Sequence, residues 1–167
     1  MKLLGAGLLW TRLIYAGVIC STKLKNHVST VKKTIVMLEE MKMLLQYLNI
    51  PVYEMLMQIS EKDYLKELCF IKECCSLMAD GTDFPVAWRN ALISANQLYK
   101  REEKEKLLQL GENLGTSNAE NQLKILNMQT SYFETFLQSA EENNKKYSTM
   151  VITLSVLFGC MVFILII

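Results

Sequence analysis

The end of the chain constrains the fold more than any other feature. The last twenty-one residues, Tyr147–Ile167, contain no charged side chain. A helix of this length reaches about 30 Å, which matches the hydrocarbon thickness of a lipid bilayer. With Ile167 as the final residue, we expect this segment to be retained rather than cleaved as a signal. The sequence therefore predicts a membrane protein with a transmembrane helix at residues 147–167.

A second apolar run, Leu3–Cys20, opens the chain and is interrupted by Arg12. An arginine at a helix centre costs about 2.5–3.5 kcal/mol on insertion, and the surrounding leucines and isoleucines offset part of this cost. A secretory signal peptide is the alternative, but bulky Ile19 stands where a lipoprotein cleavage site needs a small residue. We therefore predict that residues 1–22 span the membrane. Arg12 would snorkel, face a partner helix or anionic lipid, or lie at the edge of a tilted helix.

Lysines flank both apolar segments on their inner sides. They are Lys23, Lys25, Lys32 and Lys33 after the first segment, and Lys145 and Lys146 before the second. Positive residues are retained in the cytoplasm, so we expect residues 23–146 to form a cytoplasmic domain. The same lysines would lie on an anionic leaflet.

The middle of the chain has a helical hydrophobic period and no alternating β-branched run. The predicted fold is all-α, an antiparallel bundle of about six helices flanked by N- and C-terminal transmembrane helices. The expected helices are Val28–Leu48, Val52–Ser60, Tyr64–Ala79, one capped by Asp83 and running to about Tyr99, one from Lys100 to a left-handed end at Gly115, and one opened by the capping box Ser117–Glu120. The last helix is expected to continue into the membrane, with a break near Asn143–Asn144 as the alternative.

Residue types that carry catalysis are sparse in this chain. There is one histidine, His27, and no glycine-rich phosphate loop, so we expect no enzyme, no cofactor and no metal site. The net charge of +1 argues against a nucleic-acid partner. We expect reduced, partly buried thiols at Cys69, Cys74 and Cys75, because adjacent cysteines chelate one tetrahedral ion poorly. The glutamates of the run Lys100–Lys106 are expected to be solvated.

Two groups of side chains have both a packing and a binding interpretation. Five clustered methionines favour core filling, with a malleable partner groove as the alternative; they are Met37, Met41, Met43, Met55 and Met57. Trp88 is typical of a core anchor, and a binding hot spot is its alternative.

The segment Leu110–Asn118, with Gln122 four residues on, resembles the signature of the stage III sporulation protein AB family, Leu-Gly-x-x-Leu-Gly-x-Ser/Thr-Asp. The matching residues are Leu110, Gly111, Leu114, Gly115, Ser117 and Gln122, and Asn118 stands where the family usually has Asp. Further matches are Lys2–Gly5, Ile50–Val52, and Ala87–Arg89 with Leu92. The glycines either permit close helix packing and a tight cap, or form part of a docking surface.

The resemblance implies a non-enzymatic platform subunit, similar to the platform proteins of type II secretion and type IV pilus machines. Such a subunit would sit in the mother-cell membrane around the forespore. It would couple a cytoplasmic ATPase to membrane rings of the complex that links the two cells, and self-association is left open. The alternatives are a bitopic membrane adaptor or assembly factor unrelated to sporulation, and a small pore. A pore needs a polar stripe on the transmembrane helices, and only a weak one is present: Thr149, Thr153, Ser155 and Cys160.

Overall fold

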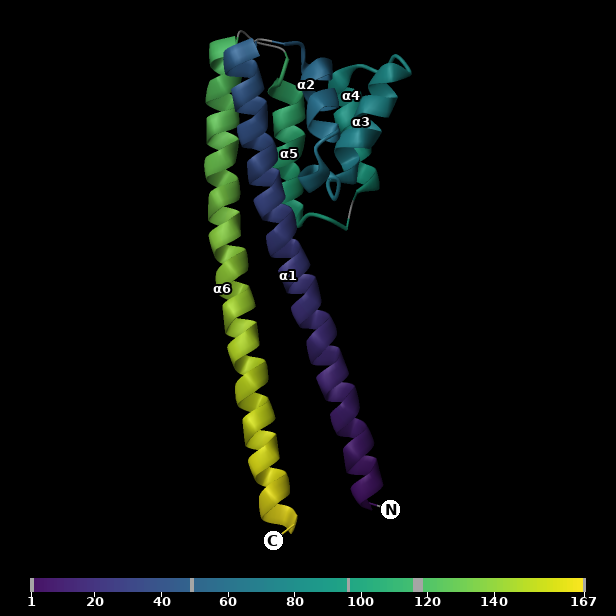
Figure 1. The fold of residues 1–167 in the computed structure, drawn as a ribbon, viewed down its shortest axis with the longest axis vertical. Helices are drawn as coiled ribbons and strands as arrows, with labels where there is room; N and C mark the ends of the chain where they lie inside the picture. The colour runs from purple at the N-terminus through teal and green to yellow at the C-terminus, as the bar shows by residue number, and fades with distance from the viewer. Residues whose placement is uncertain (1, 49, 96, 116–118, 167) are drawn as a thin grey trace. The chain divides into compact units, whose positions relative to one another are not determined.

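The computed structural model describes residues 2–48, 50–95, 97–115 and 119–166, and within these ranges the side chains from residue 22 to residue 154 except residue 152. All regular elements of this part are helices, which confirms the all-α prediction (Figure 1). In chain order they are α1 (Lys2–Leu48), α2 (Val52–Ser60), the short 3-10 helix η1 (Asp63–Leu65), α3 (Cys69–Ala79), α4 (Phe84–Ser94), α5 (Arg101–Asn113) and α6 (Ala119–Ile166).

The chain divides into two compact units. Unit 1 contains residues 1–28 and 138–167, and unit 2 contains residues 29–137. Among the helices of the described part, none is both long and apolar enough to cross a lipid bilayer. The side chains of residues 1–21 and 155–167, Arg12 included, lie outside the described set. The predicted boundaries at 1–22, 23–146 and 147–167 stay predictions.

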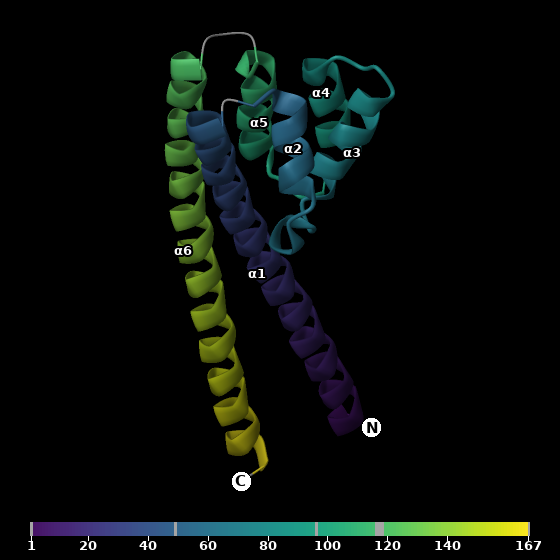
Figure 2. The same ribbon diagram turned by 45° about the horizontal axis from the view of Figure 1, so that its top comes forward.

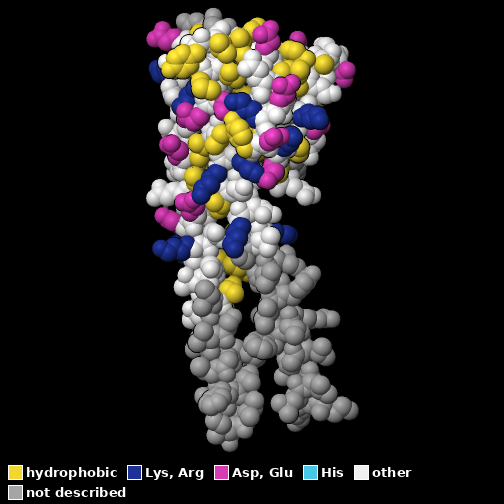
Figure 3. Space-filling model, viewed as in Figure 1, with side chains coloured by type: hydrophobic (Ala, Val, Ile, Leu, Met, Phe, Trp, Pro, Cys, Tyr) yellow, Lys and Arg dark blue, Asp and Glu magenta, His cyan; other side chains and the backbone are white. Residues whose placement is uncertain are grey.

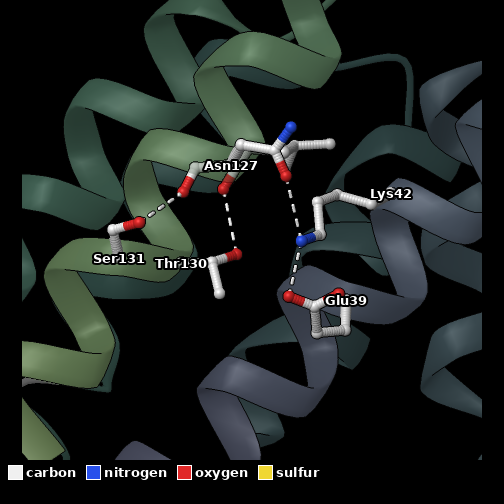
Figure 4. A network of polar contacts seen from close by, with 6 residues as sticks. Glu39, Lys42, Asn127, Thr130 and Ser131 are labelled. Atoms are coloured by element: carbon white, nitrogen blue, oxygen red, sulfur yellow. Dashed lines mark hydrogen bonds and ion pairs between the residues drawn. The ribbon is translucent and has the colours of Figure 1, made fainter.

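Unit 2 is built around the second half of α1 and the first half of α6, which lie side by side in Figures 1 and 2. Lys42 of α1 donates a 3.0 Å hydrogen bond to Oδ1 of Asn127 on α6 and also pairs with Glu39 (Figure 4). Lys106 of α5 lies 4.1 Å from the centre of the Tyr132 ring on α6. The four short helices α2–α5 gather on one side of this pair (Figures 1 and 2).

The helical spacing of five apolar residues of α1 predicts one buried face: Val31, Ile35, Leu38, Leu45 and Leu48. Val31, Leu38 and Leu45 are buried as this spacing predicts, but Ile35 is half-buried and Leu48 is 58% exposed. Leu48 is the last residue of the helix. Five other side chains of α1 are also buried: Thr30, Thr34, Met37, Met41 and Leu44.

The methionines are therefore divided between core and surface. Met37, Met41 and Met55 are core residues, as the packing interpretation predicts. Met43 and Met57 are exposed, so core filling was wrong for these two. Each lies on the outer side of its helix, away from the apolar face.

The helix predicted over Tyr64–Ala79 begins later, at Cys69. Leu68 precedes it with a non-helical backbone, φ −82° and ψ 62°. Side chains around η1 bind to α1 instead of continuing a helix: Lys62 and the Tyr64 hydroxyl both donate to Glu40. A third contact with α1 is the ion pair between Glu67 and Lys33. These contacts cross more than twenty positions of sequence, which helical periodicity does not encode.

The hydrogen bonds that Glu40 accepts from Lys62 and Tyr64 predict that the stability of the fold depends on pH. The hydrogen bond from Lys62 and then that from Tyr64 lower the pKa of Glu40 below its ordinary 4.5. A lowered folded pKa stabilises the fold above the unfolded pKa, and this contribution is lost as the pH falls through the folded value. We therefore expect Glu40→Gln to cost about 1 kcal/mol at neutral pH and almost nothing near pH ~3.

Thermal unfolding of both proteins at the two pH values measures this difference. Glu39→Gln is the matched control, because Glu39 also pairs with a lysine, Lys42, but its side chain is 51% exposed. Equal losses for Glu40→Gln at both pH values would contradict the assignment. At the alkaline end, the raised pKa of Lys62 extends the same stabilisation until the pH passes its folded value.

Helix α4 also ends earlier than predicted, at Ser94 rather than near Tyr99. Tyr99 is buried, and its hydroxyl lies 2.8 Å from Thr34 Oγ1 of α1. Thr34 Oγ1 itself donates to the Thr30 carbonyl, so the Tyr99 hydroxyl is the donor to Thr34. Burial raises the pKa of Tyr99, which keeps this hydroxyl protonated. Helix α4 ends early because Tyr99 forms a buried hydrogen bond with Thr34 of α1, which it could not reach from a continued helix.

Helix α6 runs without interruption from Ala119 to Ile166, so the alternative of a break near Asn143–Asn144 is excluded. Leu126 and Phe133 are fully buried along its first half, and their separation of seven residues places them on one side of the helix. The capping box predicted before it involves Ser117 and Asn118, which lie outside the described residues.

Candidate functional site

The centre of the candidate site is Trp88 on α4. The helix begins after Asp83, whose backbone is extended, and Pro85 occupies its first turn. Trp88 is fully buried, and its indole nitrogen donates a 2.7 Å hydrogen bond to the Leu107 carbonyl of α5. The ring packs edge-on against Phe70 of α3 at a centroid distance of 5.3 Å. Trp88 is thus a core anchor that joins three helices, as the packing interpretation predicts.

Gly111 provides the space that the indole ring occupies. A Cβ atom at this position would lie 2.1 Å from Cδ1 of Trp88 and 2.8 Å from its Nε1. No pair of carbon atoms approaches so closely without repulsion, and the ring is rigid and enclosed. The absence of a side chain at Gly111 is therefore what lets α5 approach the tryptophan of α4.

Gly115 follows the end of α5 and has a left-handed conformation, with φ +84°. The helix itself ends at Asn113, and Leu114 already has an extended backbone with ψ 134°, although its N–H still bonds to the Leu110 carbonyl at 2.8 Å. A Cβ at position 115 would lie 3.4 Å from Cγ2 of Val52, at the start of α2. The left-handed residue is thus at Gly115 as predicted, but the helix ends two residues before it, at Asn113, and Gly115 lies against Val52.

One polar contact of this region faces the solvent. Arg89, which follows Trp88, forms an ion pair with Glu112, which follows Gly111, at 2.5 Å. Both side chains are about half exposed, at 56% and 52%. The outer side of α4 also exposes Val86 and Ile93, one turn to either side of Arg89. We call this surface, Val86, Arg89, Ile93 and Glu112, the α4 face.

Three segments that are far apart in the sequence thus meet in unit 2: Pro51–Val52, Ala87–Arg89 and Leu110–Gly115. A family model described as Stage III sporulation protein AB matches residues 2–167, nearly the whole chain. The chain belongs to the stage III sporulation protein AB family. It is therefore a sporulation-related protein. Comparison with curated proteins found no significant match, and neither did comparison with solved structures.

The structure places most of the residues that resemble the family signature in the core. Leu110 and Leu114 are buried with Gly111, and Gln122 of α6 is buried as well. Ser117 and Asn118 lie outside the described residues. Within the described part, the residues of the signature serve to pack α5 against α4 and α2. None of these described residues is positioned for acid, base or nucleophilic chemistry.

One acidic residue near the site differs from its prediction. Glu103 was expected on a solvated face but is only 2% exposed. Its carboxylate accepts a 2.9 Å hydrogen bond from the backbone N–H of Lys100, the residue that caps α5. A glutamate three residues after the cap is half of a capping box, but Lys100 stands where the pattern has Ser or Thr, so the sequence carried only part of the signal.

The prediction that the three cysteine side chains are partly buried is confirmed only for two of them. Cys74 and Cys75 are buried, whereas Cys69 is exposed at the start of α3. Burial raises the pKa of Cys74 to about 12, and burial also raises that of Cys75. Both buried thiols are protonated and unreactive at neutral pH, which fits a packing role.

The predicted membrane-flanking lysines do not form one group. Lys23, Lys25, Lys145 and Lys146 are exposed and belong to unit 1. Lys32 and Lys33 belong to unit 2, where Lys33 pairs with Glu67. The tie between Lys33 and Glu67 crosses to the η1 corner, so Lys33 supports the bundle.

Proposed function

We propose that this chain is a non-enzymatic membrane platform subunit of the sporulation complex that links mother cell and forespore. Both ends of the chain would hold it in the mother-cell membrane around the forespore. Its helical unit 2 would face the cytoplasm and couple an ATPase to the membrane rings of the complex. Family membership over residues 2–167 is the observation that carries this proposal.

The α4 face is the surface we propose for contact with the ATPase. An exposed ion pair such as Arg89–Glu112 contributes only about 0–1 kcal/mol to folding. The contribution of the Arg89–Glu112 pair to folding stability is therefore too small to explain why both residues occur in segments that resemble the family. Arginine with flanking apolar side chains is the composition of an interface hot spot, and Val86 and Ile93 supply the apolar part.

Exchanging the charges of Arg89 and Glu112 distinguishes a role in binding the ATPase from a role in folding. In the double variant Arg89→Glu with Glu112→Arg, the ion pair can still form, but the charges of the surface change places. We expect the melting temperature of the full chain to change by at most about 2 °C, because the pair is exposed. We expect recovery of the ATPase with the tagged chain from sporulating cells to fall about tenfold or more, since a reversed charge in an interface costs several kcal/mol.

The matched control exchanges another exposed ion pair of α5, Arg101 with Glu105, which lie 3.0 Å apart. This control should retain the ATPase. Equal recovery from both exchanged variants and the unchanged chain would contradict the proposed surface. An adaptor unrelated to sporulation, the alternative from sequence, is disfavoured by the family match.

A further inference from the structure

The nearly neutral net charge of this chain conceals a separation of charge between its two units. Unit 1 has six basic and two acidic residues, a formal net charge of +4. Unit 2 has twelve basic and fifteen acidic residues, a formal net charge of −3. Any anionic partner would therefore be attracted by unit 1 and repelled by unit 2.

Within unit 1, the described positive charge is concentrated in one region of the two long helices. We define the lysine band as four exposed side chains: Lys23 and Lys25 of α1, and Lys145 and Lys146 of α6. Figure 3 shows dark-blue lysine side chains on both helices in this region. None of the four has a salt bridge among the described ion pairs, unlike Lys33, Lys42, Lys62 and Lys66 of unit 2.

The order of side chains along α6 shows which kind of surface the band fits. Glu141 and Glu142 are exposed one turn before Lys145. After the lysines come two exposed apolar side chains, Met150 and Leu154, which are 60% and 58% exposed. The helix surface thus changes from acidic to basic to apolar within about four turns. A lipid surface presents water, anionic headgroups and hydrocarbon in the same order.

We propose that the lysine band binds the anionic headgroups of phospholipids, with phosphatidylglycerol as the chemical type. This inference rests on the proposed membrane role and specifies the lipid class. Ammonium groups bind phosphate oxygens as point charges and need no preformed pocket, which fits four flexible, exposed lysines. A nucleic acid would use the same charges but would gain nothing from the apolar side chains that follow them.

The test measures lipid selectivity of the full chain in vesicles made of equal parts phosphatidylcholine and phosphatidylglycerol. Spin-labelled lipids of each type report the relative association constant at the protein. The unchanged chain should prefer phosphatidylglycerol over phosphatidylcholine by about fivefold. This is the ratio that corresponds to the binding free energy of one lysine near an anionic lipid surface, about 1 kcal/mol. The preference should decrease steeply with added salt. Replacing the lysine band by glutamine at all four positions should abolish it.

The control removes four exposed lysines of unit 2, so that the charge change is identical: Lys66, Lys72, Lys100 and Lys124 to glutamine. This variant should keep the preference. An equal loss in both variants would overturn the lysine band as the site, as would a preference that survives its removal. Loss caused by inorganic phosphate or by poly-uridine RNA, beyond that caused by chloride at the same ionic strength, would also overturn the lipid assignment.

The same vesicles separate this inference from the membrane role. They are washed with alkaline carbonate, which releases peripheral proteins. A chain that stays in the vesicles but shows no lipid preference overturns the lysine-band inference alone. Release by carbonate overturns the membrane role, and the lipid inference with it.

Discussion

The variant Trp88→Ala is expected to lose about 3–5 kcal/mol of unfolding free energy, the usual cost of truncating a fully buried tryptophan. The change removes the edge-on contact with Phe70 and leaves the Leu107 carbonyl without its 2.7 Å donor. A loss of this size approaches the whole stability of many domains. Denaturant unfolding of the full chain, followed by circular dichroism, measures it.

Ile93→Ala on the same helix is the control for this prediction. Ile93 is more than half exposed, so its truncation should change the unfolding free energy by less than about 0.5 kcal/mol. Similar losses for the two variants would mean that Trp88 does not anchor the bundle.

The second large effect is expected for Gly111→Ala, which should cost about 2–3 kcal/mol. Alanine is favoured over glycine inside a helix by about 1 kcal/mol, so helix propensity alone predicts the opposite sign. The cost arises because the new Cβ would lie 2.1 Å from the Trp88 ring. Thermal unfolding should show a melting temperature lower by about 5–12 °C.

Gly115→Ala gives the comparison that separates contact from backbone strain. Its positive φ penalises alanine by about 1–2 kcal/mol, but its Cβ would meet Val52 only at ordinary contact distance. We therefore expect the smaller loss at position 115. The reverse order would contradict the assigned role of Gly111.

Elements whose boundaries depend on local signals were predictable from the sequence. Helix α2 has the predicted bounds, Val52–Ser60, because Pro51 marks its start and Met55, Leu56 and Ile59 share one side. The left-handed end at Gly115 was predicted for the same reason. Both features depend on residues within one or two turns of one another.

Features decided by distant contacts were not predictable. The region around Tyr64 has helical periodicity, but its hydrogen bond to Glu40 of α1 holds it in another conformation. Similarly, Tyr99 leaves α4 to reach Thr34. The candidate site shows the same limit, because the family-like segments could be recognised singly, while the fit of Trp88 on Gly111 required the folded structure.

The most direct test of this account is a double-mutant cycle on Trp88 and Gly111, measured as unfolding free energies of the full chain. With alanine at position 88, Gly111→Ala should become neutral or slightly stabilising, because the clash is gone and helix propensity remains. The predicted coupling between the two positions is therefore about 2 kcal/mol or more. If Gly111→Ala costs the same in both backgrounds, the two residues act independently, and the packing of α5 on α4 is not what these family-like segments specify.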